Sequence, residues 1–395
     1  MSQLNYLEKL LDGEIVEWIA LGDVTLIKTG QAVSKQAIST NPGQYPVINS
    51  GKEPLGFIDK WNTDNDPIGI TTRGAGVGSI TWQEGKYFRG NLNYSVTIKD
   101  SANLEVRYLY HLLNQMQSAI QSLCTFDGIP ALNAGSLKGL EIPIPCPNNP
   151  EKSLAIQAEI VRILDAFTAM TAELTAELNM RKKQYNYYRD QLLSAENEGV
   201  EWKTLEHICT SISAGGDVPK NSSKGQTEPT DEYPYPIYAN ATGEKGLYGF
   251  TDDYKIDSEA VTISARGAKV GYHTVREAKF TPIIRLIVLI ANKDIISTRY
   301  LNYVLDMTPI GGTEAGIPQL TVPMVKKLTV PIPFPNDPKK SLIEQARIVS
   351  ILDKFDTLTT SIQEGLPREI ELRQKQYEYY RDLLLNFPKP MEETA

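Results

Sequence analysis

The sequence predicts an α+β protein in which two α/β domains in a pseudo-two-fold arrangement are separated by an antiparallel coiled coil of two long helices. Three observations predict this fold. The sequence consists of two similar copies of one repeat. Each copy ends in a long stretch with helical spacing of apolar residues. The rest of each copy consists of short β-type runs broken by Gly, Pro and Asn. A chain of 395 residues is long enough for two to three domains with a sizeable core.

Short identical blocks establish the repeat. Gly-Ile-Pro at 128–130 recurs at 316–318, and Pro-Ile-Pro at 143–145 recurs at 331–333, with the same displacement. The blocks upstream agree more loosely, so the scaffold repeats while the detail differs. Two modules of one fold with different surfaces indicate two related but non-identical recognition tasks.

The ends of the chain extend the repeat. Lys-Gln-Tyr-x-Tyr-Tyr-Arg-Asp occurs at 183–190 and again at 375–382. The N-terminal Tyr-Leu-Glu-Lys-Leu-Leu at 6–11 resembles residues 188–193, as if the chain were a circle cut within one helix. We therefore expect the two termini to lie close together.

The elements follow in order along each copy. Residues of roughly 15 to 150 and 199 to 338 predict short strands, with one helix in each, over 106–123 and 297–307. From Pro150 to about Ser194 no Gly or Pro occurs and apolar residues recur at steps of three and four, which predicts one long helix of about 60 Å.

The second long helix begins near Ser341, and Gly365-Leu366-Pro367 should break or kink it. Two such apolar stripes on one chain most economically bury each other as an antiparallel coiled coil. The alternative is that each helix packs separately on its own domain. The sequence predicts four segments. Residues 1–150 form an N-terminal domain, residues 151–198 a central helix, residues 199–338 a C-terminal domain, and residues 339–395 a C-terminal helix that is kinked near 365–367.

Composition excludes several classes of protein. Three scattered cysteines and three scattered histidines do not form the cluster of four ligands that a structural zinc site needs, so we expect no metal. A net charge of -8 argues against coating nucleic acid through bulk charge, so any DNA contact must be local. With no stretch of about 20 apolar residues and no signal peptide, we expect a cytoplasmic protein without membrane contact.

Catalytic motifs are missing as well. Gly74 to Gly78 lacks the spacing and the following helix of a dinucleotide loop, and a turn between strands is the better interpretation. The chain contains no phosphate-binding loop, no Gly-x-Ser-x-Gly elbow and no Asn-Pro-Pro-Tyr/Phe element of an adenine methyltransferase. We therefore expect a noncatalytic chain that binds no cofactor of its own.

Binding is the more natural task for Arg73 and Arg266, each followed by Gly at a predicted strand-to-loop edge. An arginine fork can pair with guanine or with phosphate, and the glycine permits close backbone approach. The alternative is an arginine held by a carboxylate inside its own domain. The full set of candidate DNA-binding residues is Arg73, Gly74, Arg89, Asn91, Asn93, Arg266, Lys269, Tyr272, His273 and Arg285.

Taken together, these features of the chain resemble the DNA-specificity subunit of type I restriction–modification enzymes, in their IC branch. The resemblance covers the whole chain and is carried by three stretches of the helices, namely Thr-Ala-Glu-Leu-Thr-Ala-Glu-Leu at 171–178, Asn179 to Leu193, and Gly365 to Leu384. Within the two domains the resemblance is one of pattern only.

The resemblance implies a noncatalytic bacterial subunit whose two target recognition domains each read one half of a bipartite, asymmetric site on double-stranded DNA. It implies two modification subunits that bring S-adenosylmethionine and methylate adenine, and two restriction subunits that use ATP and Mg²⁺. The subunit would serve both methylation and restriction, and its helices would act as a ruler and docking surface.

The same resemblance gives the spacer tract Thr171, Ala172, Glu173, Leu174, Thr175, Ala176, Glu177 and Leu178 a mechanical meaning. One four-residue unit adds about 6 Å of helix, and duplex DNA advances about 3.4 Å per base pair. Two units predict the shorter spacer of the family. The alternatives are an ordinary alanine-rich helix for this tract and, for the chain, a coiled-coil scaffold whose domains bind protein or carbohydrate.

Overall fold

The structure is a computed structural model that describes residues 6–51, 53–126, 128–194, 199–240, 246–267, 269–311, 319–361 and 363–389. It divides into two compact units. Unit 1 is Met1–Thr175 together with Glu369–Ala395, and unit 2 is Ala176–Arg368. The four segments predicted from the sequence were divided according to the repeat, whereas the two units are defined by contacts within the structure. Each unit therefore includes part of the long helix α7 (Pro150–Leu192).

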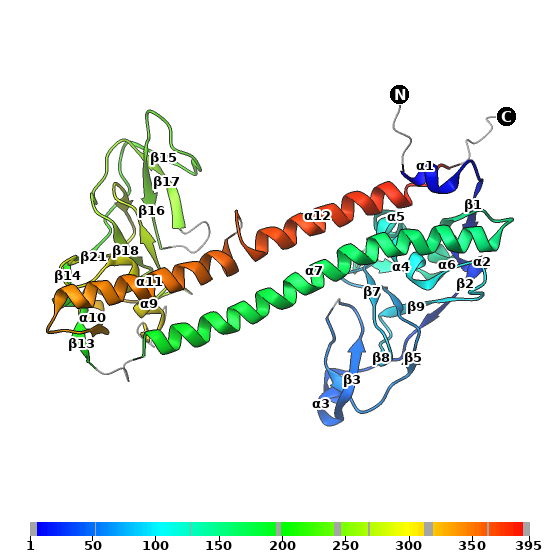
Figure 1. Cartoon of the computed structure of the whole chain (residues 1–395), viewed down its shortest axis with the longest axis horizontal. Helices are drawn as coiled ribbons and strands as arrows, with labels where there is room; N and C mark the ends of the chain where they lie inside the picture. Colours follow the sequence, from blue (N-terminus) through cyan, green and yellow to red (C-terminus); the bar gives the residue numbers. More distant parts are fainter. Residues whose placement is uncertain are drawn as a thin grey trace. The chain divides into compact units, whose positions relative to one another are not determined.

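Two four-stranded sheets form the larger part of the β structure of unit 1 (Figure 1). In the first sheet, all neighbouring strands are antiparallel. Its strands, in spatial order, are β2 (Thr25–Thr29), β9 (Asn93–Ile98), β6 (Ile68–Thr71) and β7 (Ile80–Trp82). The second sheet consists of β4 (Phe57–Ile58), β3 (Pro42–Ile48), β8 (Lys86–Arg89) and β5 (Thr63–Asp64), with β3 and β8 parallel.

Unit 2 repeats this plan with one change. Its first sheet consists of β14 (Cys209–Ala214), β21 (Ile287–Ala291), β18 (Ala260–Ile263) and β19 (His273–Arg276). Its second sheet consists of β15 (Ser222–Lys224), β17 (Leu247–Thr251), β16 (Tyr235–Tyr238) and β20 (Thr281–Pro282). The parallel pair β16–β20 matches β3–β8, but the fourth strand is added at the opposite edge of the sheet.

A two-stranded antiparallel ribbon closes each unit. In unit 1, β1 (Val16–Ala20) pairs with β12 (Glu141–Pro145), and in unit 2, β13 (Val200–Thr204) pairs with β22 (Thr329–Pro333). The registers are the same, because each ribbon sets a tryptophan opposite the first proline of Pro-x-Pro. Unit 1 has a further short pair, β10 (Cys124–Thr125) with β11 (Ala131–Leu132).

Short helices complete the units. Unit 1 has α1 (Tyr6–Leu11), α2 (Leu21–Val24), α3 (Lys35–Thr40), α4 (Val106–Gln115), α5 (Gln117–Ser122) and α6 (Ala134–Lys138). Unit 2 has α8 (Leu205–Ile208), α9 (Thr298–Asp306) and α10 (Val322–Lys326). The helix predicted over 106–123 is two helices, because the backbone of Met116 leaves the helical region between them. The second long stretch is likewise divided, into α11 (Pro338–Thr360) and α12 (Leu366–Leu385).

The long helices pair within each unit through aromatic rings. In unit 1 the rings of Phe167 on α7 and Tyr380 on α12 stack with centroids 5.1 Å apart. In unit 2 the ring of Tyr188 on α7 stacks on Phe355 of α11 at 5.7 Å. In both pairs the helices run in opposite directions (Figure 1). The fold class predicted from the sequence, with two repeated α+β domains and paired long helices, is confirmed.

The burial of α7 is uneven along its length. Its fully buried side chains all lie in the first half, and they are Ser153, Ile156, Gln157, Ile160 and Leu164. The spacer tract at 171–178 is exposed or half-buried throughout. The apolar stripe therefore forms a core contact only where it meets a domain.

Equivalent polar contacts fix a helix to each domain. In unit 1 the side-chain amide of Gln157 donates to the Asn103 carbonyl at 3.0 Å, and its oxygen accepts from the Glu105 N–H at 2.9 Å. In unit 2 Gln345 donates to the Ile295 carbonyl at 2.8 Å and accepts from the Ser297 N–H at 2.9 Å. Since a buried amide must satisfy both of its ends, these contacts set the register of helix and domain.

The three cysteines are free. Cys124 and Cys146 are buried and Cys209 is half-buried. Cys124 and Cys146 pack in the core of unit 1 and Cys209 packs against the core of unit 2, and this burial raises the pKa of all three thiols.

Candidate nucleic-acid interface

In unit 1 the ends of several strands meet in one cluster of loops. Gly30 after β2 donates its N–H to the Asn93 carbonyl at 3.2 Å, and the Gly90 N–H after β8 donates to the Ile48 carbonyl at 2.8 Å. The loop that follows β6 joins them, because the Thr72 N–H donates to the Leu92 carbonyl at 2.9 Å. We call the residues 30–31, 49–50, 72–79 and 89–93 loop cluster 1.

The corresponding loops of unit 2 meet in the same way. The Arg285 N–H donates to the Gly215 carbonyl at 3.1 Å, and the Ile283 N–H donates to the Tyr238 carbonyl at 2.9 Å. Asn240 ties in the third loop, because its side chain accepts from the Ala265 N–H at 2.9 Å and donates to the Ile284 carbonyl. We call the described residues of 215–216, 239–240, 265–272 and 283–286 loop cluster 2.

Arg73 and Arg266 occupy matching places in these clusters. Each side chain is exposed, and each backbone forms an isolated antiparallel bridge, Arg73 to Ala131 and Arg266 to Gln319. Within the described residues neither guanidinium has a carboxylate partner, so the alternative of an internal ion pair finds no support there. Both side chains are thus exposed, and their contact with DNA stays a prediction.

The glycines that follow these arginines are required by the backbone. Gly74 has a φ of 90° and Gly267 a φ of 89°, in the left-handed region that side chains disfavour. The Gly74 N–H also donates to the Pro130 carbonyl at 2.9 Å. Gly74 therefore shapes the turn that presents Arg73, and any direct DNA contact by Gly74 stays a prediction.

Arg89 and Asn93 lie inside unit 1 instead of on its surface. Arg89 is 3% exposed and donates to the carbonyls of Ile68 and Asp66, at 3.1 and 2.7 Å. Its guanidinium also reaches the side chains of Asn93, at 2.6 Å, and Tyr87. Burial lowers the pKa of Arg89, and the nearby Asp66 carboxylate opposes this shift. These two residues join the two sheets, so the case for DNA contact rests on the others.

The remaining candidates are distributed over both clusters. Asn91 is exposed in loop cluster 1, and Lys269, Tyr272 and Arg285 are exposed in loop cluster 2. His273 is half-buried on β19, with its ring nitrogens 3.1 Å from Asn302 Oδ1 and 3.4 Å from Asp306 Oδ1. His273 is therefore turned toward helix α9, away from its cluster neighbours.

Sequence reasoning missed the residues that hold the loops together. Asn49 accepts from the Leu92 N–H at 2.9 Å, which parallels the contact of Asn240 in unit 2. A Cβ on Gly30 would lie 2.2 Å from the Gly90 carbonyl oxygen, and one on Gly215 would lie 2.7 Å from the Ile283 nitrogen. The signal was the Asn in the matching runs Tyr-Pro-Val-Ile-Asn and Tyr-Pro-Ile-Tyr-Ala-Asn, at 45–49 and 235–240.

Neither a metal site nor a membrane span was found in the described part of the chain. No group of three or more His, Cys, Asp or Glu side chains there is arranged to hold a metal ion. No helix in that same part is long and apolar enough to cross a membrane.

Comparison with known proteins follows the same division into two halves. Residues 14–181 and 197–372 each match the type I restriction modification DNA specificity domain. The chain is 38% identical, over 99% of both chains, to the type I restriction enzyme EcoR124I/EcoR124II specificity subunit of Escherichia coli. It is 32% identical, over 97% of this chain and 98% of the relative, to a putative type I restriction enzyme specificity subunit of Haemophilus influenzae.

Solved structures agree on the fold. The S subunit of a type I restriction-modification system from M. genitalium superposes with a TM-score of 0.63 at 19% identity, over 96% of this chain and 98% of that one. A second structure comes from work on the structural basis of complex assembly and conformational transition of the type I R-M system. It superposes with a TM-score of 0.52 at 15% identity, over 94% of this chain and 97% of that one. The family-model match and the curated relatives place the chain in the type I restriction–modification DNA specificity family, as a specificity subunit with two DNA-recognition domains.

Proposed function

We propose that this chain reads a bipartite, asymmetric site on double-stranded DNA, with one half-site per unit. The observation that carries the proposal is the duplicated loop cluster. The same backbone frame presents an exposed arginine in each unit, while the neighbouring side chains differ, Asn91 in one and Lys269, Tyr272 and Arg285 in the other. A shared frame with unlike polar side chains suits two different base sequences.

We further propose that the paired helices dock two modification subunits, and that the complex recruits two restriction subunits. Relatives of this chain are specificity subunits of type I restriction enzymes, which supports such an assembly. S-adenosylmethionine, ATP and Mg²⁺ would then enter through those partners. The subunit would direct both adenine methylation and restriction to the same site.

The experiment is to co-express the chain with an IC-type modification subunit and to map adenine methylation across the host genome. We expect a single bipartite motif with a fixed gap between its halves. A stable complex that methylates no motif would contradict DNA reading by this chain and would favour a scaffold. Methylation of a continuous, ungapped motif would contradict reading by two separate units.

A further inference from the structure

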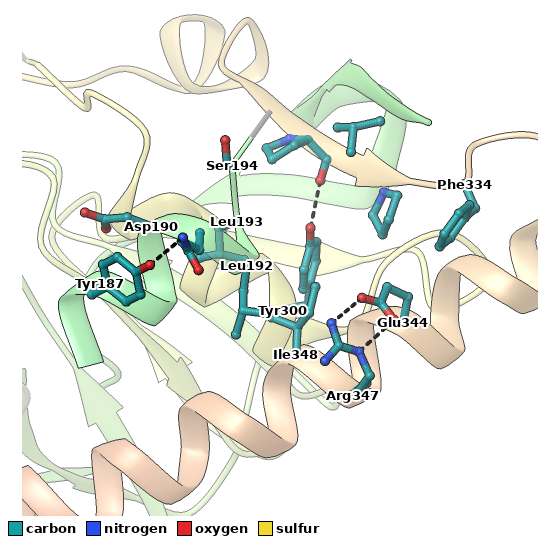
Figure 2. Close-up of a pocket in the computed structure, with 14 residues that line it drawn as sticks. Tyr187, Asp190, Leu192, Leu193, Ser194, Tyr300, Phe334, Glu344, Arg347 and Ile348 are labelled. Atoms are coloured by element: carbon teal, nitrogen blue, oxygen red, sulfur yellow. Dashed lines mark hydrogen bonds and ion pairs between the residues drawn. The ribbon is translucent and has the colours of Figure 1, made fainter. Parts of the chain in front are cut away.

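A cavity of about 860 Å³ opens in unit 2 where the end of α7 meets the β13–β22 ribbon and the start of α11. Figure 2 shows Leu192 and Leu193 on one side, Phe334 on the other, and Tyr300 and Ile348 between them. The ion pair of Glu344 and Arg347 also borders it. A volume in this range is typical of sites that bind a ligand.

The repeat identifies the counterpart of this cavity in unit 1. The Tyr300 hydroxyl donates to the Pro331 carbonyl at 3.2 Å, and the Tyr108 hydroxyl donates to the Pro143 carbonyl at the same distance. In the register that aligns Gln345 with Gln157, Ile348 corresponds to Ile160. In the register of the tyrosine blocks, Leu192 and Leu193 correspond to Leu384 and Leu385. Both units therefore share these wall residues, whereas Phe334 and Glu344 of unit 2 stand where unit 1 has Cys146 and Ile156.

In unit 1 the helix α1 lies beside the counterparts of these wall residues. Leu7 and Leu11 are 2% and 6% exposed and belong to the same core cluster as Ile160, Leu384 and Leu385. The Tyr6 hydroxyl donates to the Glu159 carboxylate at 3.1 Å. Leu384 is 1% exposed there, whereas its counterpart Leu192 is only half-buried in unit 2.

We propose that the cavity of unit 2 is a seat for a short amphipathic helix of a partner protein. The bound helix would present two leucines, or aliphatic side chains of similar size, at positions i and i+4, because that spacing places Leu7 and Leu11 on one face of α1. The proposal concerns protein binding and does not rest on DNA recognition.

The charge of Arg347, at the edge of this seat, specifies one more feature of the partner helix. Arg347 occupies the register position of Glu159 and its side chain is 52% exposed. Where α1 presents a hydroxyl that donates to a carboxylate, the partner helix would present a group that accepts from the guanidinium of Arg347, in addition to its ion pair with Glu344. An acidic residue just before the first leucine meets this requirement.

The probe is a fluorescein-labelled peptide of residues 1–14 in which Tyr6 is replaced by Glu, added to the full-length protein labelled at its Leu, Val and Ile methyl groups. We expect saturable binding by fluorescence anisotropy, with NMR shifts of the methyls of Leu192, Leu193, Val200 and Ile348. The control peptide carries Leu7→Asp and Leu11→Asp in addition and should not bind.

Two protein variants complete the test. Leu192→Asp should weaken binding about tenfold or more, because it places a charge against the apolar face of the peptide. Leu372→Asp, the same change at an exposed position of α12, should leave binding unaltered, and circular dichroism establishes that both variants are folded.

Three outcomes would overturn the proposal. The first is no binding at millimolar peptide, and the second is equal binding by Leu192→Asp. The third is a concentration-dependent dimer of the free protein, detected by sedimentation and abolished by Leu192→Asp, because the occupant would then be a second copy of this chain. Since no DNA is present, none of these results bears on the proposed reading of a bipartite site.

Discussion

Single positions of the repeat meet the same requirement with different side chains. In unit 1 the Asp165 carboxylate contacts Arg107 Nε and His111 Nε2, both at 2.8 Å. In unit 2 the equivalent Asp353 accepts from the Tyr303 hydroxyl at 2.7 Å. A buried imidazole in one unit is thus replaced by a phenol in the other, and only the imidazole titrates near neutral pH.

This difference predicts a pH-dependent stability of unit 1. Burial lowers the pKa of His111, and the hydrogen bond to Asp165 opposes that shift only in part. Because the unfolded chain then binds more protons below about pH 6.5, the free energy of unfolding should fall as the pH drops through that value. The measurement is urea unfolding at pH 7.5 and pH 5.5 with the variant His111→Tyr as the comparison. A wild-type protein whose pH dependence equals that of His111→Tyr would contradict this role of His111.

The exposed arginines of the two loop clusters give a second prediction. Arg73→Ala and Arg266→Ala should each weaken reading of one half-site, by roughly 1–3 kcal/mol if the guanidinium pairs with guanine. Once the methylation motif is known, fluorescence anisotropy with duplexes altered in one half or the other measures this. Equal losses at both half-sites would point to a folding defect and would count against specific readout.

Among the elements, the sequence was most informative for the long helices and least informative for the interior of the sheets. Steps of three and four apolar residues without Gly or Pro predicted a helix from about 150 to 194, and α7 spans Pro150–Leu192. The sequence around a single arginine, by contrast, does not show whether its side chain is exposed, as in Arg73, or buried, as in Arg89. Its partners, the carbonyls of Ile68 and Asp66, are brought near it only by the pairing of strands.

The loop clusters show the same limit. The sequence indicated the Gly after Arg73 and after Arg266, because a glycine beside a predicted strand edge is a local signal. The matching runs at 45–49 and 235–240 contain Asn49 and Asn240 but do not show their role, which depends on loops that are distant in sequence. Contacts between segments that are far apart along the chain leave no periodic trace in it.

The spacer tract at 171–178 predicts how the length of α7 affects the recognised DNA site. The tract lies within the continuous helix α7, and Thr171 and Thr175 donate their hydroxyls to the carbonyls one turn earlier, at 2.9 and 2.8 Å. Deleting residues 175–178 removes about 6 Å of helix, and we expect the gap in the methylated motif to shorten by about one or two base pairs. Methylome mapping of the deletion variant reads this out directly. An unchanged gap would refute the ruler, and a matched substitution of the four residues by alanine serves as the control.

For the whole molecule, each unit has its own hydrophobic core. Leu109 on α4 and Leu301 on α9 are fully buried at equivalent positions of the two cores. Leu109→Ala and Leu301→Ala should each cost about 2–5 kcal/mol, and each should act chiefly on its own unit. Hydrogen exchange followed by mass spectrometry in moderate urea resolves the two units. Loss of protection in both units from either substitution would show that they unfold as one.

The three native cysteines, two buried and one half-buried, leave the chain suited to site-specific labelling. Burial raises the pKa of Cys209 to about 12 and raises those of Cys124 and Cys146 as well, so thiolate is scarce at neutral pH. Maleimide dyes or nitroxide spin labels should therefore react first with a cysteine introduced at an exposed site outside the loop clusters, such as Phe57 or Val218. Pairs of such labels can report the separation of the two recognition domains in solution, on and off DNA, without removing a native cysteine.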